Sequence, residues 1–318
     1  MSPAPIFSFA TTAEEVGTAF AAEIKGKNVL ITGTSLNGIG FEAARVIAKY
    51  ANLVVITGYN DERLKLSEVA IKKEVPTANI HRLILDLSSL PGVRKAAVTI
   101  NSQPLPLHVL IHNAAAPIGP FKLTVDNLEN QFATDHVGPF LLTKLLLPRL
   151  LAAATPTYTP RVVFVASAAH AFGKGIVDFA VLAQPDAEKY ETSDAYFQAK
   201  SANILTAAEI SRRSKGALNA YSLHPGLIYT NMAQKEESID ALKATGMLGA
   251  DGLPNHEKWD WKTIPQAAFD PSLNDKPGAY LDNCAVASDG VAVHTSDPAS
   301  AEKLWSITEK IIGETFTF

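Results

Sequence analysis

The sequence predicts an α/β fold, in which one doubly wound parallel sheet of about seven strands carries helices on both faces. Three observations predict it. Short apolar runs alternate along the chain with longer segments of helical spacing. The first apolar run leads through a glycine-rich turn into an alanine-rich helix pattern. The chain has 318 residues, 47% of them hydrophobic, which is enough for one large domain.

The expected strands are apolar runs separated by turns. In chain order they are residues 28–32, 53–57, 82–86, 109–112, 161–167, 218–224 and, near the C-terminus, 279–282. An N-terminal helical extension, 1–26, is expected before them, because Thr12 and Glu15 have the spacing of a capping box. No internal repeat or low-complexity linker interrupts the chain, so residues 1–318 are expected to form a single domain.

The turn after the first strand has the composition of a phosphate-binding loop. Gly33 allows a sharp exit from the strand, and Gly38 lets the backbone approach a pyrophosphate. Gly40 lets the following helix pack on the sheet, with its N-terminal amides facing the anion. The alternative is an ordinary tight turn whose glycines serve conformation alone.

Tyr196 and Lys200 are one helical turn apart and therefore share a helix face. A neighbouring ammonium group stabilises the ionised form of a phenol, which makes Tyr196 a candidate general acid and base. A chain with eight tyrosines could contain such a pair by chance, so its weight depends on its surroundings.

The glycine turn and the Tyr/Lys pair together resemble the short-chain dehydrogenase/reductase family, and the resemblance extends over nearly the whole chain with its Rossmann-type fold. The family's turn reads Thr-Gly-x-x-x-Gly-x-Gly. This chain has four residues instead of three between Gly33 and Gly38. The turn is expected to bulge near Leu36 and Asn37, since Asn tolerates left-handed backbone.

Further landmarks of the family occur in the expected order. The resemblance implies that Asp86 contacts the adenine ring, that Ser167 is the catalytic serine, and that a Pro-Gly turn holds the nicotinamide. The full set of implied coenzyme contacts is Gly33, Ser35, Asn37, Gly38, Ile39, Gly40, Tyr59, Asn60, Arg63, Asp86, Leu87, Asn113, Ala114, Ala115, Tyr196, Lys200, Pro225, Gly226, Ile228 and Thr230. Singly, such residues also suit helix caps, strand ends and plain turns.

One catalytic position departs from the family. The helix after the fourth strand usually carries Asn, where this chain has Asp135. Asp keeps the size of Asn but exchanges a donor for a charge or an acceptor. Its carboxylate could hold Lys200 charged, it could replace Asn sterically, or it could be only a polar residue in a helix. Asp135 therefore joins Ser167, Tyr196 and Lys200 as a candidate catalytic residue.

The end of the second strand bears on the choice of coenzyme. In this fold an acid there binds the ribose 2′-hydroxyl of NAD, and a base accommodates the 2′-phosphate of NADP. Tyr59 stands at that position, and Asn60 and Arg63 could coordinate a phosphate. NADP(H) is therefore favoured over NAD(H), although Asp61 close by could reverse the preference.

Two segments exceed the minimal family plan and are expected to form the substrate pocket. Residues 168–195 resemble the insertion of the branch that contains retinol dehydrogenases and the WW-domain-containing oxidoreductase. Residues 227–262 follow the Pro-Gly turn as a substrate lid. Their apolar and aromatic residues suit a lipophilic or aromatic ketone, aldehyde or alcohol as the substrate.

Two other functions are kept as alternatives. One is a non-catalytic NAD(P)-binding sensor or scaffold, which Asp135 and the lengthened turn keep open. The other is a sugar-nucleotide epimerase or dehydratase of the extended branch, which shares the Tyr/Lys pair. Those proteins usually carry Gly-x-x-Gly-x-x-Gly, which this chain lacks.

Composition excludes several other classes. A net charge of −4 without any run of lysines and arginines gives no support for nucleic-acid binding. The single Cys284 excludes an internal disulfide framework and fits a reducing compartment. No membrane span or secretory leader is expected, so the cytoplasm is the expected location, and a homo-oligomer is left open. His170, His224 and His256 lack metal-ligand spacing, so no metal is expected.

Overall fold

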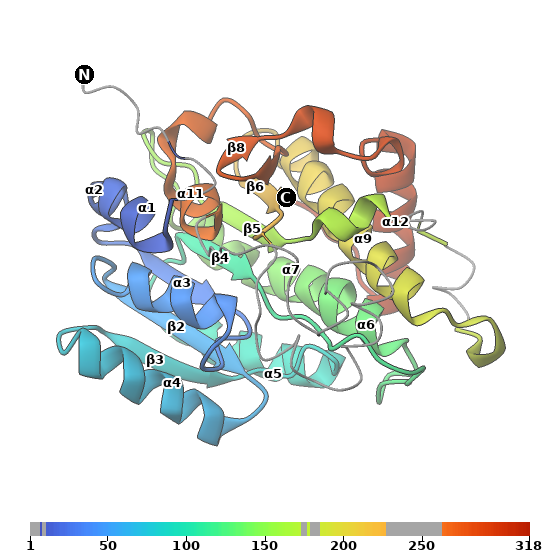
Figure 1. Cartoon of the computed structure of the whole chain (residues 1–318), viewed down its shortest axis with the longest axis horizontal. Coiled ribbons are helices and arrows are strands. Elements are labelled where there is room, and N and C mark those ends of the chain that lie inside the picture. The colour runs from blue at the N-terminus through green and yellow to red at the C-terminus, as the bar shows by residue number, and fades with distance from the viewer. Residues whose placement is uncertain (1–6, 8–10, 173–176, 179–184, 227–262) are drawn as a thin grey trace, which may run out of the picture.

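The computed structural model describes residues 7, 11–172, 177–178, 185–226 and 263–318 (Figure 1). One eight-stranded sheet forms its centre, in the order β3-β2-β1-β4-β5-β6-β7-β8. The strands are β1 Asn28–Ile31, β2 Leu53–Gly58, β3 Ile80–Ile84, β4 Val109–His112, β5 Arg161–Val165, β6 Asn219–Leu223, β7 Tyr280–Asp282 and β8 Ala285–Val286. The first seven pair in parallel, which confirms the predicted parallel sheet.

The central strands are apolar throughout because they are buried on both sides. In β1 the side chain of Leu30 joins the hydrophobic core on one face of the sheet, and those of Val29 and Ile31 join the core on the other. Parallel strands covered by helices on both faces have such continuous apolar sequences. This explains why uninterrupted apolar runs identified the strands.

The helices form two layers, one on each face of the sheet (Figure 1). The first layer contains α1 Ala13–Ala19, α2 Ala21–Ile24, α3 Ile39–Ile47, α4 Asp61–Glu74 and α11 Thr263–Phe269. The second contains α5 Leu90–Asn101, α6 Asn130–Phe132, α7 Gly138–Leu151, α9 Thr192–Ser214 and α12 Pro298–Ile312. The predicted arrangement of helices on both faces is therefore confirmed.

Several boundaries differ from the sequence prediction. The third strand lies two residues earlier than predicted, so Asp86 follows the strand in a turn where its Oδ1 accepts a hydrogen bond from Ser88 N at 2.9 Å. The N-terminal segment forms two helices, because Phe20 leaves helical geometry with φ −103° and ψ 22°. The predicted capping box of Thr12 and Glu15 is present at its start.

The eighth strand was not predicted. It pairs antiparallel with β7 through a hairpin whose two loop residues, Asn283 and Cys284, have φ of +48° and +58°. Positive φ at both loop positions gives the turn whose twist matches that of the flanking strands.

The strand order reverses between β1 and β4, whose connections leave in opposite directions. Sheets of this kind bind ligands in the crevice at the carboxyl ends of the strands beside such a switch point. Gly33 follows β1 at this edge and Asn113 follows β4, with Ser167 after β5 and His224 after β6. The fold thus brings Gly33, Asn113 and Ser167, predicted site residues from distant parts of the chain, to one edge of the sheet.

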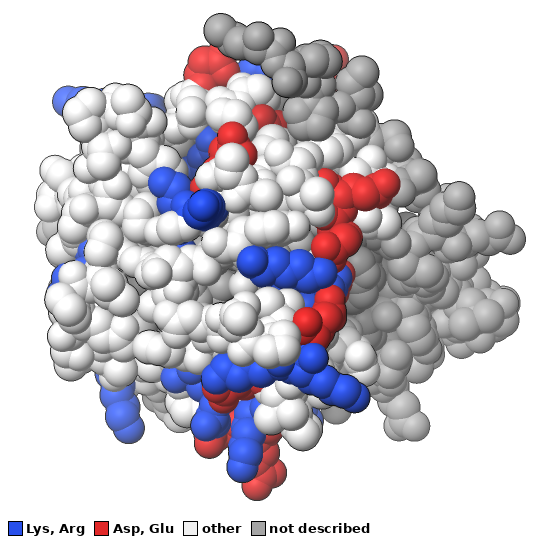
Figure 2. Space-filling model, turned by 90° about the vertical axis from the view of Figure 1, so that its left-hand side faces the viewer, with Lys and Arg blue, Asp and Glu red and all other residues white. Residues whose placement is uncertain are grey.

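Charges on the outer surface are mixed in sign. Arg45 and Lys49 around the end of α3 form ion pairs with Glu14 of α1 at 3.1 and 2.8 Å, which fasten the N-terminal helix to the fold. Figure 2 shows acidic and basic side chains lying next to one another on one face of the molecule. Within the described ranges, no helix is long and apolar enough to cross a membrane.

Candidate active site

The glycine-rich turn is held against the loop that follows β4. The Thr32 hydroxyl oxygen accepts hydrogen bonds from the backbone amides of Asn113 and Ala114, both at 3.0 Å. The Asn113 side chain donates in return to the carbonyls of Thr32 and Gly33, both at 2.9 Å. The two strands on either side of the switch point therefore present their ends as one rigid unit.

Two glycines in the turn are required by close approach. A Cβ at Gly33, whose φ is +71°, would lie 2.7 Å from Ala114 Cα. A Cβ at Gly40 would lie 2.4 Å from Asn113 Nδ2 and 2.6 Å from the Gly33 carbonyl oxygen. Asn37 has φ of +58°, the left-handed backbone predicted for this lengthened turn. The extra residue is thus accommodated at Asn37.

The start of α3 suits a phosphate group. Gly38 is the residue that caps this nine-residue helix, and as a glycine it has no side chain to bond to the amides of the first turn. Such amides point out of the helix end and favour an anion there. Ser35 and Ile39 are half-buried beside them. The cradle that a Cβ would fill and these amide donors fit the pyrophosphate of a dinucleotide.

A basic side chain, Arg63, lies in the first turn of α4 just after β2. Tyr59 is 65% exposed, and Arg63 Nη1 donates to its hydroxyl at 3.4 Å. Asn60 Oδ1 caps α4 by accepting from Arg63 N at 3.0 Å. Within the part of the chain that the structure describes, Arg63 forms no ion pair.

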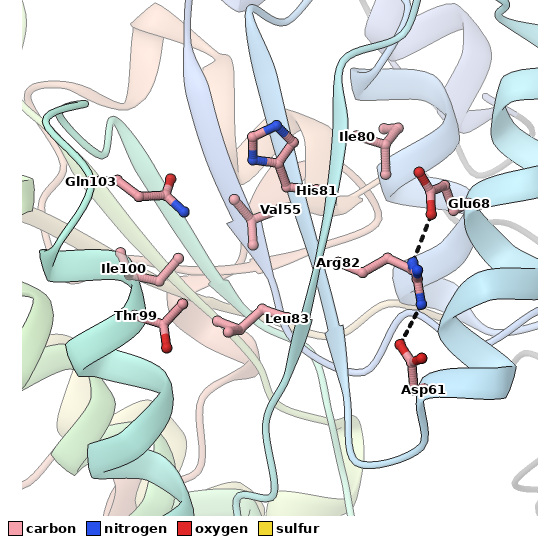
Figure 3. A pocket seen from close by; sticks show the side chains of 10 residues that line it. All are labelled: Val55, Asp61, Glu68, Ile80, His81, Arg82, Leu83, Thr99, Ile100 and Gln103. Carbon is pink, nitrogen blue, oxygen red and sulfur yellow. Dashed lines mark hydrogen bonds and ion pairs between the residues drawn. The ribbon is translucent and has the colours of Figure 1, made fainter.

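Asp61 is held away from this position by Arg82. In Figure 3 the Arg82 side chain of β3 lies between Glu68 and Asp61 of α4 and forms an ion pair with each. The open hollow drawn there, between β3, α4 and α5, is lined by none of the residues predicted to bind coenzyme or to catalyse. The carboxylate that could have reversed the coenzyme preference thus has another partner.

The other predicted coenzyme contacts that the structure describes lie at the same edge of the sheet. Asp86 is exposed, Leu87 beside it is buried, and Ala114 and Ala115 are half-buried in the loop after β4. Gly226, with φ of +95°, follows Pro225 after β6. Ile228, Thr230, the whole of 227–262 and residues 173–176 and 179–184 of the other insertion lie outside the described residues.

Ser167 and Tyr196 come from adjoining elements. Ser167 begins a short 3₁₀ helix, η2 Ala168–Ala171, which packs against α9. Tyr196 lies in the first turns of α9 and forms a small apolar cluster with Ile118, Ala169 and Phe197. Ser167 and Tyr196 are both 8% exposed. Both hydroxyl-bearing residues are thus largely buried, and the Tyr196 ring lies against an apolar wall.

Lys200 lies beneath Tyr196 and is paired with Asp135. Lys200 Nζ is 5.4 Å from the centre of the Tyr196 ring and 3.0 Å from Asp135 Oδ2. It also donates to the Val165 carbonyl at 3.3 Å. Both charged side chains are almost wholly buried, at 3% and 0% exposure. Of the three interpretations of Asp135, the structure supports a carboxylate that holds Lys200 charged.

A local irregularity of the helix presents Asp135. The residues Ala133–Val137 form a π-helical turn between α6 and α7. Single π turns are often found at functional sites because they redirect side chains. Asp135 Oδ1 accepts from the Ala116 amide at 2.7 Å, while Oδ2 faces Lys200. One carboxylate therefore connects the loop after β4 to α9.

The pair is electrostatically coupled. Burial is the largest single influence on the pKa of Lys200 and lowers it. The Asp135 carboxylate, with a smaller contribution from Tyr196, acts in the opposite direction, and the pKa of Lys200 lies above the ordinary value of 10.5. Burial raises the pKa of Asp135, and the charge of Lys200 acts against that rise. Because the folded-state pKa of Lys200 is raised, the stability due to its charge is present at neutral pH and is lost as the pH rises through that pKa.

A partly buried polar network near the site is not predicted from the sequence. Tyr190 Oη donates to Glu129 Oε1 at 3.1 Å and accepts from Gln131 Nε2 at 2.8 Å. Glu129 also caps α6. These contacts fix the segment before α9 to the helix that carries Asp135. Their partners lie 59 and 61 positions apart in the chain, and no local pattern indicates them.

The histidines considered in the sequence as metal ligands have structural contacts where the structure describes them. Within the described ranges no three His, Cys, Asp or Glu side chains gather in a group that could hold a metal ion. His170 and His224 each bond to backbone atoms near Ser167, and His256 lies outside the described residues.

The family model described as short chain dehydrogenase matches residues 27–179. Short-chain dehydrogenase TIC 32 A, chloroplastic, of Brassica napus is 34% identical over 319 residues, covering 96% of this chain and 94% of that protein. Retinol dehydrogenase 13 of Homo sapiens is 30% identical, covering 92% of this chain and 86% of its own. The RhlG/NADP active-site complex of Pseudomonas aeruginosa has a TM-score of 0.59 at 20% identity, covering 81% and 94% of the two chains.

The buried ion pair predicts a large effect of Asp135→Asn on stability. The substitution leaves the Lys200 ammonium buried with an amide in place of its counter-ion. Removing one partner of a buried ion pair costs about 3–5 kcal/mol of unfolding free energy. The double variant Asp135→Asn/Lys200→Met, which removes both charges, is expected to be more stable than Asp135→Asn alone. Urea unfolding at neutral pH measures both differences.

The matched control is Asp186→Asn, which removes the carboxylate of an exposed Asp–Lys pair with an Nζ–Oδ2 distance of 2.9 Å. It is expected to leave the unfolding free energy near that of the wild type. Equal stabilities of Asp135→Asn and Asp186→Asn would contradict the buried pair.

Proposed function

The chain belongs to the short chain dehydrogenase family, as an NAD(P)-dependent dehydrogenase or reductase of the branch that includes retinol dehydrogenases, and from this premise we propose its reaction. The enzyme interconverts a ketone or aldehyde and the corresponding alcohol on a lipophilic or aromatic small molecule. Tyr196 is its acid and base, Ser167 binds the substrate oxygen, and Lys200 with Asp135 sets the charge beneath Tyr196.

The observation that carries the proposal is the buried ion pair below Tyr196. Lys200 keeps its charge in the protein interior because Asp135 lies 3.0 Å away. A fixed positive charge under the phenol stabilises the phenolate that forms when Tyr196 gives its proton to a substrate oxygen. In alcohol oxidation the same charge favours removal of the hydroxyl proton. The arrangement therefore serves both reduction of the carbonyl and oxidation of the alcohol.

The coenzyme would be held by the glycine turn, the amides at the start of α3 and the ends of β2, β4 and β6. When bound, a nicotinamide supplies or accepts the hydride. Tyr196 and Ser167 orient the reacting oxygen, and the Tyr196 proton moves to or from it. Lys200 is also proposed to contact the coenzyme, at its ribose.

An apolar substrate is supported by the wall around Tyr196. Ile118, Ala169 and Phe197 pack with the tyrosine ring, and Phe172 stands 44% exposed with its ring centre 6.1 Å from that of Phe197. An exposed aromatic side chain at such a place gains hydrophobic free energy when a ligand covers it. We propose that 168–195 and 227–262 complete this pocket within the single domain 1–318.

NADP(H) is proposed as the preferred coenzyme. The supporting observation is that Arg63 has no ion pair in the described residues, while Asp61 is bound to Arg82. A guanidinium at the end of β2 can bind the 2′-phosphate. The RhlG complex contains NADP, and at its low identity it supports the shared fold alone.

No observation favours the alternative functions. The features that kept a non-catalytic sensor open were Asp135 and the lengthened turn, and both fit the site through the ion pair and the backbone of Asn37. The chain lacks the glycine pattern of the sugar-nucleotide enzymes.

The cytoplasmic location stays a prediction, because the Brassica napus relative is named as chloroplastic. The oligomeric state likewise stays open.

Tyr196→Phe tests the reaction. The change removes the transferable proton and keeps the ring, so turnover with a panel of aromatic and aliphatic carbonyls is expected to fall roughly 10²–10⁴-fold. Affinity for the coenzyme, measured by titration, should change little. Tyr50→Phe is the control, since the Tyr50 hydroxyl contacts Thr18 at 3.3 Å on the N-terminal helix. Turnover of Tyr196→Phe within a few-fold of the wild type would mean that another group is the acid.

Arg63→Ala tests the coenzyme preference. Loss of a charge-assisted hydrogen bond worth about 1.5–3 kcal/mol should weaken NADP(H) binding roughly ten- to a hundredfold and leave NAD(H) binding nearly unchanged. Lys65→Ala, at an exposed position of the same helix, removes the same charge and is expected to affect neither coenzyme selectively. Equal effects of the two substitutions would show that only net charge matters. Tighter binding of NAD(H) by the wild type would contradict the preference.

A further inference from the structure

The backbone around Ser167 is held by two imidazole rings. The Ala168 amide donates to His224 Nδ1 at 3.2 Å. The Ser167 carbonyl oxygen lies 2.7 Å from His170 Nδ1. The Ser167 hydroxyl oxygen itself accepts from the Ala169 amide at 3.1 Å. The position of this hydroxyl therefore depends on where the short helix η2 is held.

His224 approaches from the end of β6. It immediately precedes Pro225 and Gly226, and its own amide donates to the Leu281 carbonyl at 2.9 Å, which fixes its backbone on β7. Because Nδ1 accepts a backbone amide proton, the ring is neutral and carries its hydrogen on Nε2. Burial lowers the pKa of His224, Asp282 acts against this, and His170 adds to it. The acceptor is thus present at neutral pH.

His170 holds the other side of the same loop. A carbonyl oxygen only accepts, so His170 Nδ1 donates to Ser167. Its Nε2 accepts from the Ala292 amide at 3.3 Å, which connects η2 to the C-terminal segment. His170 thus fastens the serine loop to the scaffold. His224 fastens it to the turn proposed to hold the nicotinamide.

We propose that His224 is a positioning residue for Ser167, whose imidazole Nδ1 fixes the serine hydroxyl relative to the Pro225–Gly226 turn. The inference rests on the proposed function, in which Ser167 binds the substrate oxygen and the turn holds the nicotinamide. Both groups must meet the same carbonyl, one at its oxygen and the other at its carbon. A displacement of about 1 Å between such groups can cost roughly 10²-fold in rate.

The chemistry of the ring offers matched substitutions. In asparagine the side-chain oxygen is separated from Cβ by the same bonds as Nδ1 of histidine, so His224→Asn can keep the acceptor for the Ala168 amide. Glutamine places its oxygen one bond further away, near the position of Nε2. Leucine keeps much of the volume and has no acceptor. If the His224 ring only filled space, the loss of kcat in the three variants would follow the volume of the substituted side chain.

The experiment compares the three variants with the carbonyl substrate found for the wild type. His224→Leu and His224→Gln are expected to lose about 10- to 100-fold in kcat, with the affinity for coenzyme unchanged and KM changed little. His224→Asn is expected to recover most of that loss. Amide hydrogen exchange over residues 167–172 should be faster in the Leu and Gln variants than in the Asn variant.

Three outcomes would overturn the proposal: wild-type kcat in His224→Leu and His224→Gln, equal loss in all three variants, or equal exchange in all three. If His224→Leu does not fold, the comparison of Gln with Asn decides alone, since both are polar and differ in where the acceptor lies. Failure of the proposed function looks different. The wild type would then reduce no carbonyl of the panel, while the exchange comparison would still measure the His224–Ala168 hydrogen bond.

Discussion

The site depends on one requirement, that a lysine charge be kept inside the protein. An isolated ammonium taken out of water is unstable by several kcal/mol, and it persists only when a counter-ion and hydrogen bonds replace the water. Lys200 finds these in Asp135 at 3.0 Å and in the carbonyl of Val165. Three elements have to meet for this: α9, the π-helical turn before α7 and the end of β5. The positions of Tyr196 and Ser167 follow, because one lies on α9 and the other just after β5.

Much of the fold could be predicted because its signals are local. Strands buried on both faces are apolar at every position, and the predicted strands agree with the observed ones within two or three residues at each end. The hairpin of β7 and β8 could not be found this way. Its outer strand has two residues, and its turn contains Asn283 and Cys284, where the usual signal is a glycine.

The sequence predicts which residues belong to the candidate site, but it does not predict the contacts between them. The Tyr196–Lys200 pair and the glycine turn carry spacing that the sequence displays. The sequence leaves the role of Asp135 open. An ion-pair partner of Lys200, a steric substitute for Asn and a polar residue with no part in the site would have the same sequence, and they differ only in where the carboxylate points. The Glu129–Tyr190 contact and the His224–Ala168 contact join residues 61 and 56 positions apart, and no periodicity records such pairs. They are consequences of the sheet order, which brings the ends of β4, β5 and β6 to one edge.

The geometry also gives a physical reason why Asp is compatible with a position where the family usually has Asn. Two donors converge on residue 135, the Ala116 amide at 2.7 Å and the Lys200 ammonium at 3.0 Å. A carboxylate has two oxygens, of which one accepts from the Ala116 amide and the other forms the ion pair with Lys200, whereas a carboxamide has one oxygen and turns its NH₂ group towards one of the donors. The loop after β4, which holds the glycine turn through Asn113 and Thr32, is thereby connected by one side chain to the charge beneath Tyr196. A change of charge at residue 135 would therefore act on both the loop proposed to bind coenzyme and the tyrosine proposed as acid and base, through a single buried carboxylate.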